Sequence, residues 1–353
     1  MHNPRSKPAA FTGFFSQARS ESRVHRSAVD ITPLTHLGVL AVRGVDARKF
    51  LSGQLSQDVL ALRADRVELA GLHNPQGRVL ALLRLVAQGP DDVLCVLPRA
   101  ALADTLALLQ KFLLRAKATL SDESALWQIE GLASTPQALP DPVGSALRVP
   151  GNNGETVIWR HASDGRLMCL RAATHVVPAE SSPTDAGAAL AAWQRADIAA
   201  GIPEITPATR GEFVAQMLNL DVQGGISFTK GCYTGQEVIA RAHYRGRVKR
   251  RTQRFRLAAG PLPAPGEKLE LEMDVAGTKI RRSAQVINAV ADQTGIAGIE
   301  CLAVAAFAAA EPATAEAATA EAAATADAPT AGSANETPAR AASALPMSYS
   351  LPD

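Results

Sequence analysis

The sequence predicts an α+β protein with a smaller all-β unit toward its C-terminus. Between residues 37 and 113, short apolar runs bounded by turn residues alternate with stretches of helical periodicity, a mixture typical of α+β folds. Short strands bounded by glycines follow over residues 241–302, and no repeat of fixed length is visible. The chain has 353 residues, so its core needs neither disulfides nor structural metals.

The first half of the chain gives the clearest signals for individual elements. Asp46 is a suitable N-cap for a helix, and apolar residues recur after it at helical spacing as far as Val59. We expect a strand over Leu37–Val42, followed by a helix from Asp46 whose buried face carries Phe50, Leu51, Leu55 and Val59. Two strands then follow, over Val79–Val86 and Val93–Leu97. A second helix starts at Arg99, and its inward face carries Leu102, Leu106, Leu109 and Leu113.

The second half divides by composition. Ala188–Ala200 predicts a helix, whereas Arg241–Leu257 alternates like a strand and Val275–Ile299 adds more short strands, which together predict a small β-barrel or sandwich. We expect a disordered leader over 1–29, an α+β body over 30–240, the β unit over 241–302, a disordered Ala-rich segment over 303–343, and a C-terminal end, 344–353, that docks on the body. Deletion of 303–343 should then leave the melting temperature nearly unchanged.

Charge and cysteine content exclude several classes of protein. The net charge is +2, but residues 1–302 hold 35 basic and 28 acidic side chains, a mild excess that suits anionic small molecules or nucleic acid. The four cysteines are far apart, without CxxC or Cys/His metal spacing, so we expect no stable metal centre and a reducing, cytoplasmic setting. No apolar run is long enough to span a membrane. We also expect the protein to be a monomer.

One segment carries candidate chemistry: Lys230-Gly-Cys-Tyr-Thr-Gly-Gln-Glu237. Two nearby glycines let the backbone bend, so the thiol of Cys232 is expected on an exposed turn, with Lys230 favouring its thiolate. These two residues are the catalytic candidates. The alternative is a small buried cysteine in a glycine-rich connection. Cys95, Cys169 and Cys301 lie in apolar runs and are expected in the core.

This segment resembles the signature of the YgfZ-type folate-binding proteins, relatives of the glycine-cleavage T-protein that act in maintaining certain iron–sulfur enzymes. Three other stretches also resemble that family: Trp193–Pro203, Asn219–Phe228 and Leu345–Leu351. The resemblance implies a T-protein-like folate-binding body with a central hole, a small C-terminal β-barrel, and a ligand that is tetrahydrofolate or a one-carbon derivative. It implies cofactor binding by Trp193, Tyr233, Gln236, Glu237, Arg241 and Arg245; a core role for Trp193 is the alternative, and Leu37 replaces a second tryptophan of some relatives.

Three functional hypotheses follow. The leading one is a tetrahydrofolate-binding accessory factor, not a stand-alone enzyme, whose partners are iron–sulfur enzymes or cluster assembly proteins and which supports tRNA modification indirectly. The second is a folate-dependent aminomethyltransferase, but Ala81 and Leu82 stand where T-proteins carry adjacent aspartates after an Asn-x-x-Gly turn, here Asn74–Gly77. The third is direct RNA binding by Arg241, Arg245, Arg247 and Lys249, which would lie on one face of a strand. The alternative is that these basic residues are a solvent-exposed edge of the barrel that binds nothing.

Overall fold

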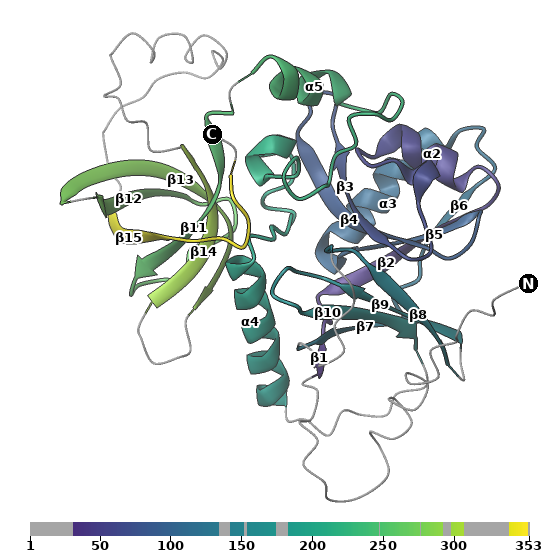
Figure 1. Ribbon diagram of the computed structural model, residues 1–353, viewed down its shortest axis with the longest axis horizontal. Coiled ribbons are helices and arrows are strands. Elements are labelled where there is room, and N and C mark those ends of the chain that lie inside the picture. Colours follow the sequence, from purple (N-terminus) through teal and green to yellow (C-terminus); the bar gives the residue numbers. More distant parts are fainter. Residues whose placement is uncertain are drawn as a thin grey trace, which may run out of the picture.

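The computed structural model describes residues 31–133, 142–151, 154–173, 183–246, 248–275, 277–291, 298–306 and 339–351. The predicted leader lies outside these ranges, as does most of the Ala-rich segment. The predicted α+β class is confirmed, because two five-stranded sheets with flanking helices are followed by a closed five-stranded barrel (Figure 1). In that view the barrel and the two sheets lie on opposite sides of helix α4 (Pro183–Ala199).

The body consists of two sheets that share an apolar interior. One has the order β3 (Val67–His73), β4 (Val79–Ala87), β5 (Asp92–Pro98), β2 (Leu37–Arg43), β6 (Thr119–Asp122). The other has the order β1 (Ile31–Pro33), β7 (Trp127–Leu132), β10 (Leu167–Ala172), β9 (Gly154–Arg160), β8 (Ala146–Gly151). All of the strand pairs in both sheets are antiparallel.

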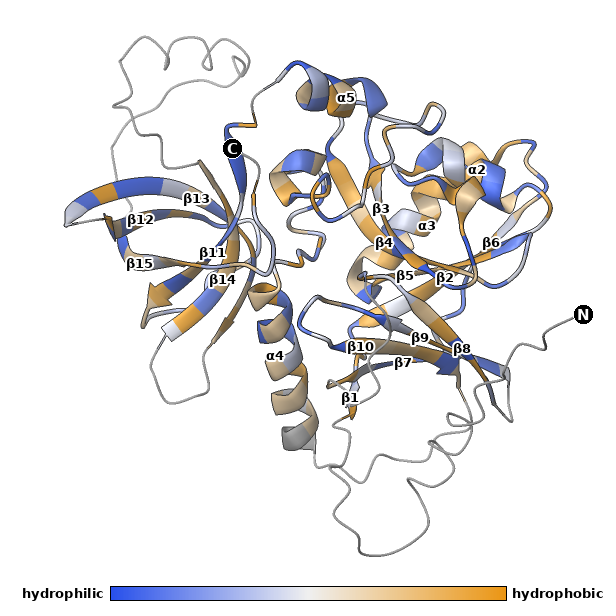
Figure 2. Ribbon diagram, viewed as in Figure 1, coloured by the Kyte–Doolittle hydropathy of each residue, from blue (hydrophilic) through white to orange (hydrophobic). Residues whose placement is uncertain are grey.

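Strand β2 shows why its sequence is an uninterrupted apolar run. Leu40 and Val42 face a core that includes Phe50 and Leu51 of helix α2 (Ala47–Gln54). The alternate residues Val39 and Ala41 face a second core, which the other sheet and Trp193 of α4 complete. Because apolar cores cover both faces of β2, neither set of alternate residues along the strand is polar. Figure 2 shows the same apolar colouring along the central strands of the body.

The two helices predicted in the first half of the chain are present. Helix α3 (Arg99–Leu113) buries Leu102 and Leu109 as expected. Helix α2 is shorter than predicted, since Val59 belongs to a separate 3-10 turn, Val59–Ala61. Asp46 precedes α2 but does not cap it with its side chain, because its carboxylate accepts a hydrogen bond from the Lys117 backbone N–H at 2.8 Å instead.

The barrel has the strand order β11 (Arg250–Ala258), β14 (Gly298–Ala306), β13 (Thr278–Ala291), β12 (Lys268–Val275), β15 (Arg340–Leu345). The strand-like reading of residues 241–249 was wrong, because Arg241 lies in helix α5 (Gln236–Tyr244) and the barrel begins at Arg250. Arg241 and Arg245 alternate in sequence, but a spacing of four also places two side chains on one face of a helix.

The two ends of the Ala-rich segment differ from the expected disorder. Ala303–Ala306 continue β14, where Ala303 and Ala305 are fully buried in the barrel core. Strand β15 closes the barrel by pairing with β11 and with β12. Deletion of residues 303–343 would therefore remove half of one barrel strand and most of another. Small alanine side chains fit the narrow interior of a five-stranded barrel, which composition alone does not reveal.

The end of the chain lies on the body beside α4. The Tyr349 hydroxyl donates to the Gly201 carbonyl at 2.8 Å and accepts from Asn219 Nδ2 at 3.2 Å. Ser348 Oγ donates to the Ala200 carbonyl at 2.8 Å. Gly201 has φ +72°, and a Cβ there would lie 2.7 Å from the Tyr349 ring, so this approach requires glycine.

Candidate functional site

Two adjoining cavities lie between the body and the segment after α4, and the smaller one also reaches the barrel. The smaller has a volume of about 200 Å³ and the larger about 420 Å³. The walls of the smaller cavity come from both sheets, α4 and barrel strand β13. Five residues line both cavities: Leu82, Arg84, His161, Ile202 and Pro203. The two spaces therefore meet at Leu82 and Arg84, which are neighbours on the same face of β4.

Arg84 is the most informative residue of this site. Within the part of the chain that the structure describes, its guanidinium has neither a hydrogen bond nor an ion pair within 4 Å, although it lines both cavities. Burial lowers the pKa of Arg84, and the nearby charges of Asp197 and Glu204 oppose that shift. A guanidinium carries five N–H donors, so an unpartnered one in a cavity favours an anionic or carbonyl-bearing ligand.

A buried polar network forms one wall beside Arg84. His161 Nε2 lies 2.9 Å from Asp197 Oδ1, and Arg166 donates to the same oxygen at 2.7 Å. Burial alone would raise the pKa of Asp197, but His161, Arg166 and Arg84 together lower it to about 2. The ionised carboxylate can only accept, so His161 carries its proton on Nε2. Burial also lowers the pKa of His161, which leaves Nδ1 as a buried acceptor without a partner in the described residues.

Trp193 lines the smaller cavity, as does Leu37, but its ring is already in contact with protein groups. His161 stacks on it with ring centroids 5.3 Å apart, and the Arg166 guanidinium carbon lies 4.5 Å from the ring centroid. Gly131 is a close neighbour too, since a Cβ there would lie 2.5 Å from the ring. Trp193 therefore belongs to the core, with 6% of its surface exposed, and also lines the cavity; ligand binding by its ring stays a prediction.

Lys230 anchors the cysteine loop to helix α2. Its ammonium donates to the carbonyls of Ser52 and Leu55, the latter at 2.7 Å, and lies 4.7 Å from the centroid of the Tyr233 ring. Burial lowers the pKa of Lys230 to about 8, with Asp58 opposing the shift. These carbonyls at the C-terminal end of α2 lack helical partners, so Lys230 supplies the donor that they need.

Gly235 anchors the same loop to the turn between β3 and β4. It begins α5 with φ +82°, and a Cβ there would lie 2.5 Å from the Asn74 carbonyl oxygen. On the other side of this contact, Gly77 has φ +71° and faces Val238 of α5. The Asn74–Gly77 turn and the cysteine loop are thus locked together, and both glycines are required by the close approach.

Between these anchors, Cys232 is exposed, as predicted. Cys95, Cys169 and Cys301 are buried, also as predicted, and burial raises the pKa of each thiol to about 12. Cys232 lines neither of the two cavities. In the described ranges, no group of three or more His, Cys, Asp or Glu side chains is arranged to hold a metal ion.

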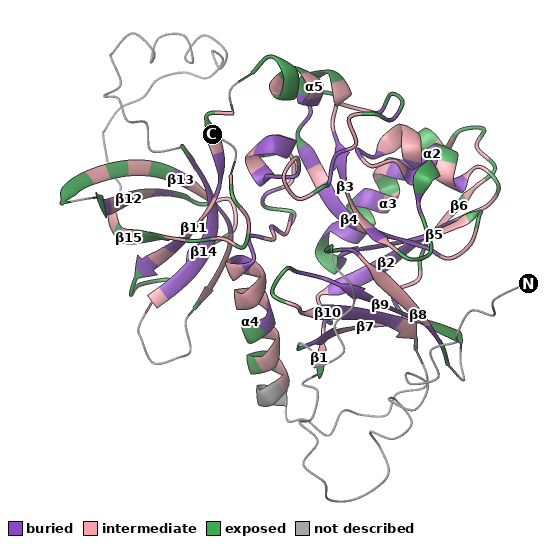
Figure 3. Cartoon of the chain, in the orientation of Figure 1, coloured by how far each residue is buried: buried purple, intermediate pink, exposed green. Residues whose placement is uncertain are grey.

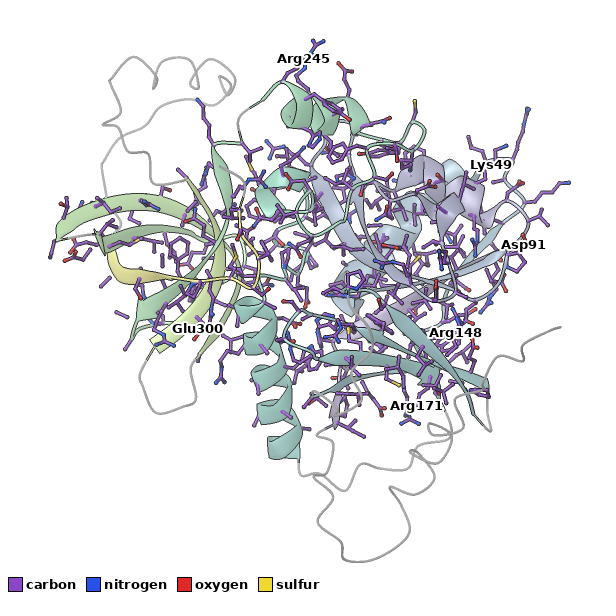
Figure 4. The ribbon with its side chains drawn as sticks, viewed as in Figure 1. Lys49, Asp91, Arg148, Arg171, Arg245 and Glu300 are labelled. Carbon is purple, nitrogen blue, oxygen red and sulfur yellow. The ribbon has the colours of Figure 1, made fainter. Side chains whose placement is uncertain are left out.

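The remaining predicted cofactor residues lie away from the two cavities. Tyr233, Gln236, Glu237, Arg241 and Arg245 line neither space. Glu237 and Arg241 form an exposed ion pair at 3.5 Å on α5. Figure 3 shows α5 as largely exposed, and Figure 4 shows Arg245 at its outer end, directed away from the body. Of the six predicted cofactor residues, Trp193 alone lines one of these two cavities.

Sequence reasoning missed the polar residues of the cavity, which are Arg84, His161, Asp197 and Glu204. One signal was present: Arg84 interrupts the apolar strand Val79–Ala87, and a charge within a buried strand needs a partner or a ligand. The other three come from the residue after β9, from α4 and from the segment that follows α4, so only the folded chain brings them together.

The fold defines a class of protein: an aminomethyltransferase-like α+β body with a C-terminal barrel. The structure resembles glycine cleavage system aminomethyltransferase T from Bartonella henselae, with a TM-score of 0.51, 15% identity and 79% of each chain covered. No family model matches the chain. No helix in the described part of the chain has the length and apolarity to cross a membrane.

Relatives in sequence are more specific. The chain is 31% identical over 293 residues to the tRNA-modifying protein YgfZ of Escherichia coli O157:H7 (strain EC4115 / EHEC), covering 81% of this chain and 88% of the relative. It is 31% identical over 296 residues to the protein of that name from Escherichia fergusonii, with the same coverage. The chain belongs to the YgfZ family.

Proposed function

We propose that the protein binds tetrahydrofolate or a one-carbon derivative in the paired cavities and serves as an accessory factor for iron–sulfur enzymes. The observation that carries the folate half is Arg84, an unpartnered guanidinium at the junction of the two cavities. Membership of the YgfZ family and the aminomethyltransferase-like fold support the same ligand class.

The cavity walls suit the parts of such a ligand. A pterin is flat, and the smaller cavity offers apolar side chains around it, among them Leu37, Met168 and Ile202. The acidic tail of a folate needs basic groups, and Arg66, Arg84 and Arg160 line the larger cavity. Arg66 already pairs with Glu68 at 2.8 Å, so Arg84 is the guanidinium most available to a ligand. A few convergent polar groups in an apolar pocket are typical of small-molecule sites.

Aminomethyl transfer is not the expected reaction. Leu82 lines both cavities at one of the two positions where T-proteins carry aspartates, and it cannot accept a proton. Ala81, at the other position, faces the opposite side of β4 and is buried in the core against α2 and α3. A glycine-cleavage assay with the purified protein should therefore show no transfer of a one-carbon unit to tetrahydrofolate.

Cys232 is proposed to meet the iron–sulfur partner. It is the exposed thiol of the four, on a loop held from both sides by Lys230 and Gly235. A single thiolate cannot hold a stable cluster, so the contact would be transient or shared with the partner. Direct RNA binding by a basic strand is not proposed, because the strand that the hypothesis needs is replaced by α5, where Arg241 pairs with Glu237.

The test of folate binding is calorimetry with tetrahydrofolate on the wild type, Arg84→Met and Arg115→Met. Arg115 is an exposed arginine after α3 that lines neither cavity, so it controls for the loss of a positive charge. We expect Arg84→Met to weaken binding about tenfold or more, as loss of a charged hydrogen bond predicts, and Arg115→Met to bind like the wild type. Absence of binding by the wild type at millimolar ligand would refute the folate proposal.

The test of the iron–sulfur role uses Cys232→Ser in cells. The variant should keep the wild-type melting temperature and tetrahydrofolate affinity, because the side chain is exposed and outside both cavities. It should lower the activity of a dependent iron–sulfur enzyme. Full activity of such enzymes with the serine variant would contradict the proposed role of the thiol.

A further inference from the structure

Glu204 occupies a fixed position in the wall of the smaller cavity. It follows α4, and its backbone is held from both sides by one barrel side chain. The Glu204 N–H donates to Asn288 Oδ1 at 2.8 Å, and the Glu204 carbonyl accepts from Asn288 Nδ2 at 3.3 Å. Asn288 lies on β13, where the register of the β13–β14 pairing shifts. The segment that carries Glu204 is therefore docked on the barrel and does not depend on a ligand for its place.

The carboxylate of Glu204 has hydrogen-bonding capacity that the protein does not use. In the described residues no donor makes a hydrogen bond to it; His36 Nε2, its ion-pair neighbour, is 3.6 Å from Oε2. His36 has a buried Nδ1 without a partner as well. Burial raises the pKa of Glu204 to about 7, with Arg84 opposing the shift. The side chain is 30% exposed, so a ligand in the cavity that it lines can supply donors to its unused acceptor sites.

Glu204 and Arg84 offer opposite halves of one recognition pattern. The carboxylate can accept two parallel hydrogen bonds, and the guanidinium of Arg84 can donate to a carbonyl, while both line the smaller cavity. A ring that presents two adjacent N–H donors next to a carbonyl would satisfy both groups. The 2-amino-4-oxopyrimidine edge of a pterin has this order, with the 2-amino group and N3–H beside the carbonyl at position 4.

We propose that Glu204 and Arg84 read the 2-amino-4-oxo edge of the bound ring, Glu204 accepting from the 2-amino group and N3–H and Arg84 donating to the 4-carbonyl. This inference rests on the proposed function, since it names the group by which a folate is selected in that cavity. Glu204 is then a specificity-determining residue, placed on the segment after α4, at a distance in sequence from the aspartate positions of β4 that Ala81 and Leu82 occupy.

The affinity for the ring should depend on pH, because only the ionised carboxylate of Glu204 accepts both hydrogen bonds. The charged and titratable groups that face Glu204 are His36 from the segment between β1 and β2, Arg84 from β4 and Asp197 from α4; β13 contributes the neutral Asn288. Burial lowers the pKa of His36, and Asp197 is ionised well below neutral pH. Between pH 6 and 8, the ionised fraction of Glu204 thus increases, and ligand affinity should rise over that interval.

The experiment compares two ring probes by calorimetry: 6-methyltetrahydropterin and 6-methyltetrahydrolumazine, in which a carbonyl replaces the 2-amino group. The wild type should bind the pterin about ten- to a hundredfold more tightly than the lumazine, the range that loss of charged hydrogen bonds predicts. Glu204→Gln should lose most of this preference and the rise in affinity between pH 6 and 8. Glu212→Gln, an exposed carboxylate that lines neither cavity, should retain both.

Binding of tetrahydrofolate distinguishes a failure of the role of Glu204 from a failure of the folate proposal. If the wild type and Glu204→Gln bind tetrahydrofolate equally and neither distinguishes the two ring probes, the role of Glu204 is refuted and the folate proposal stands. If the wild type binds none of the three ligands, both proposals are refuted. Weaker pterin binding by Glu204→Gln, with an unchanged preference for the pterin over the lumazine, would also overturn the inference, because a merely structural role of Glu204 would produce that result.

Discussion

Replacing Gly235 by alanine tests whether the cysteine loop is a rigid structure. An alanine at φ +82° costs about 1–2 kcal/mol, because Cβ meets the backbone in the left-handed region. The added Cβ would also lie 2.5 Å from the Asn74 carbonyl oxygen, and the backbone movement that relieves this contact costs about 1–3 kcal/mol. A less flexible unfolded chain offsets about 0.4–1 kcal/mol. The expected loss of stability is about 2–4 kcal/mol.

Gly231 is the matched control, four residues away in the same loop. Nothing lies within 4 Å of a Cβ built there, and its φ is outside the left-handed range. Gly231→Ala should therefore change the stability by less than about 0.5 kcal/mol. Both substitutions add one methyl group beside Cys232, so general effects on the loop sequence cancel in the comparison.

The measurement is urea unfolding followed by tryptophan fluorescence and circular dichroism. With a denaturant dependence of about 2–3 kcal/mol per molar urea, Gly235→Ala should lower the midpoint by about 1 M and Gly231→Ala should leave it in place. Equal midpoints for the two variants would show that the contact between Gly235 and the Asn74–Gly77 turn is not a constraint. The reasoning about the loop anchors would then be refuted.

Three other predictions concern separate parts of the molecule. His73 is buried, and burial lowers its pKa from 6.5 to about 4. The unfolded chain therefore takes up a proton at a higher pH than the folded chain, and the stability should fall by up to about 3 kcal/mol as pH drops from 6.5 to 4. In pH-dependent unfolding, His73→Asn should remove this loss, and His243→Asn, at an exposed position, should not. Tyr349→Phe removes the hydroxyl that bonds Gly201 and Asn219 and should cost about 1–3 kcal/mol in thermal unfolding, whereas exposed Ser350→Ala should cost nothing measurable. Limited alkylation at neutral pH with peptide mapping should label Cys232 first, because burial shields the other three thiols; equal labelling of Cys95 would contradict this.

Local patterns predicted the elements well where the pattern has one meaning. Strands β4 and β5 and helix α3 match their periodicity, because turn residues and leucine spacing point to the same structure in each case. Residues 241–245 were misread because an alternation of arginines is compatible with both a strand and a helix. The β-barrel was expected, but its closure by Arg340–Leu345 was not, since that strand follows a long Ala-rich segment whose composition gives no pairing signal.

The candidate site was predicted in one part and missed in the other. The exposure of Cys232 was predicted from the two glycines that let the backbone bend beside it, which is a local feature. The cavity depends on Arg84, Asp197 and Glu204, which approach each other only after β4, α4 and the barrel have packed. Lys230 was expected to favour the thiolate of Cys232, which stays a prediction; its ammonium donates to two carbonyls at the end of α2.

Strand β4 connects the cysteine loop with the two cavities, which leads to a last prediction. The Asn74–Gly77 turn holds the cysteine loop, and seven residues further along β4 the strand delivers Arg84 to the cavities. At about 3.3 Å per residue, the turn and Arg84 are roughly 23 Å apart, too far for a ring bound at Arg84 to touch Cys232. Saturating tetrahydrofolate should therefore leave the alkylation rate of Cys232 unchanged, while Gly235→Ala should alter it. Protection of the thiol by ligand would show that β4 and its turn shift on binding, and that the cavity and the cysteine loop do not act independently.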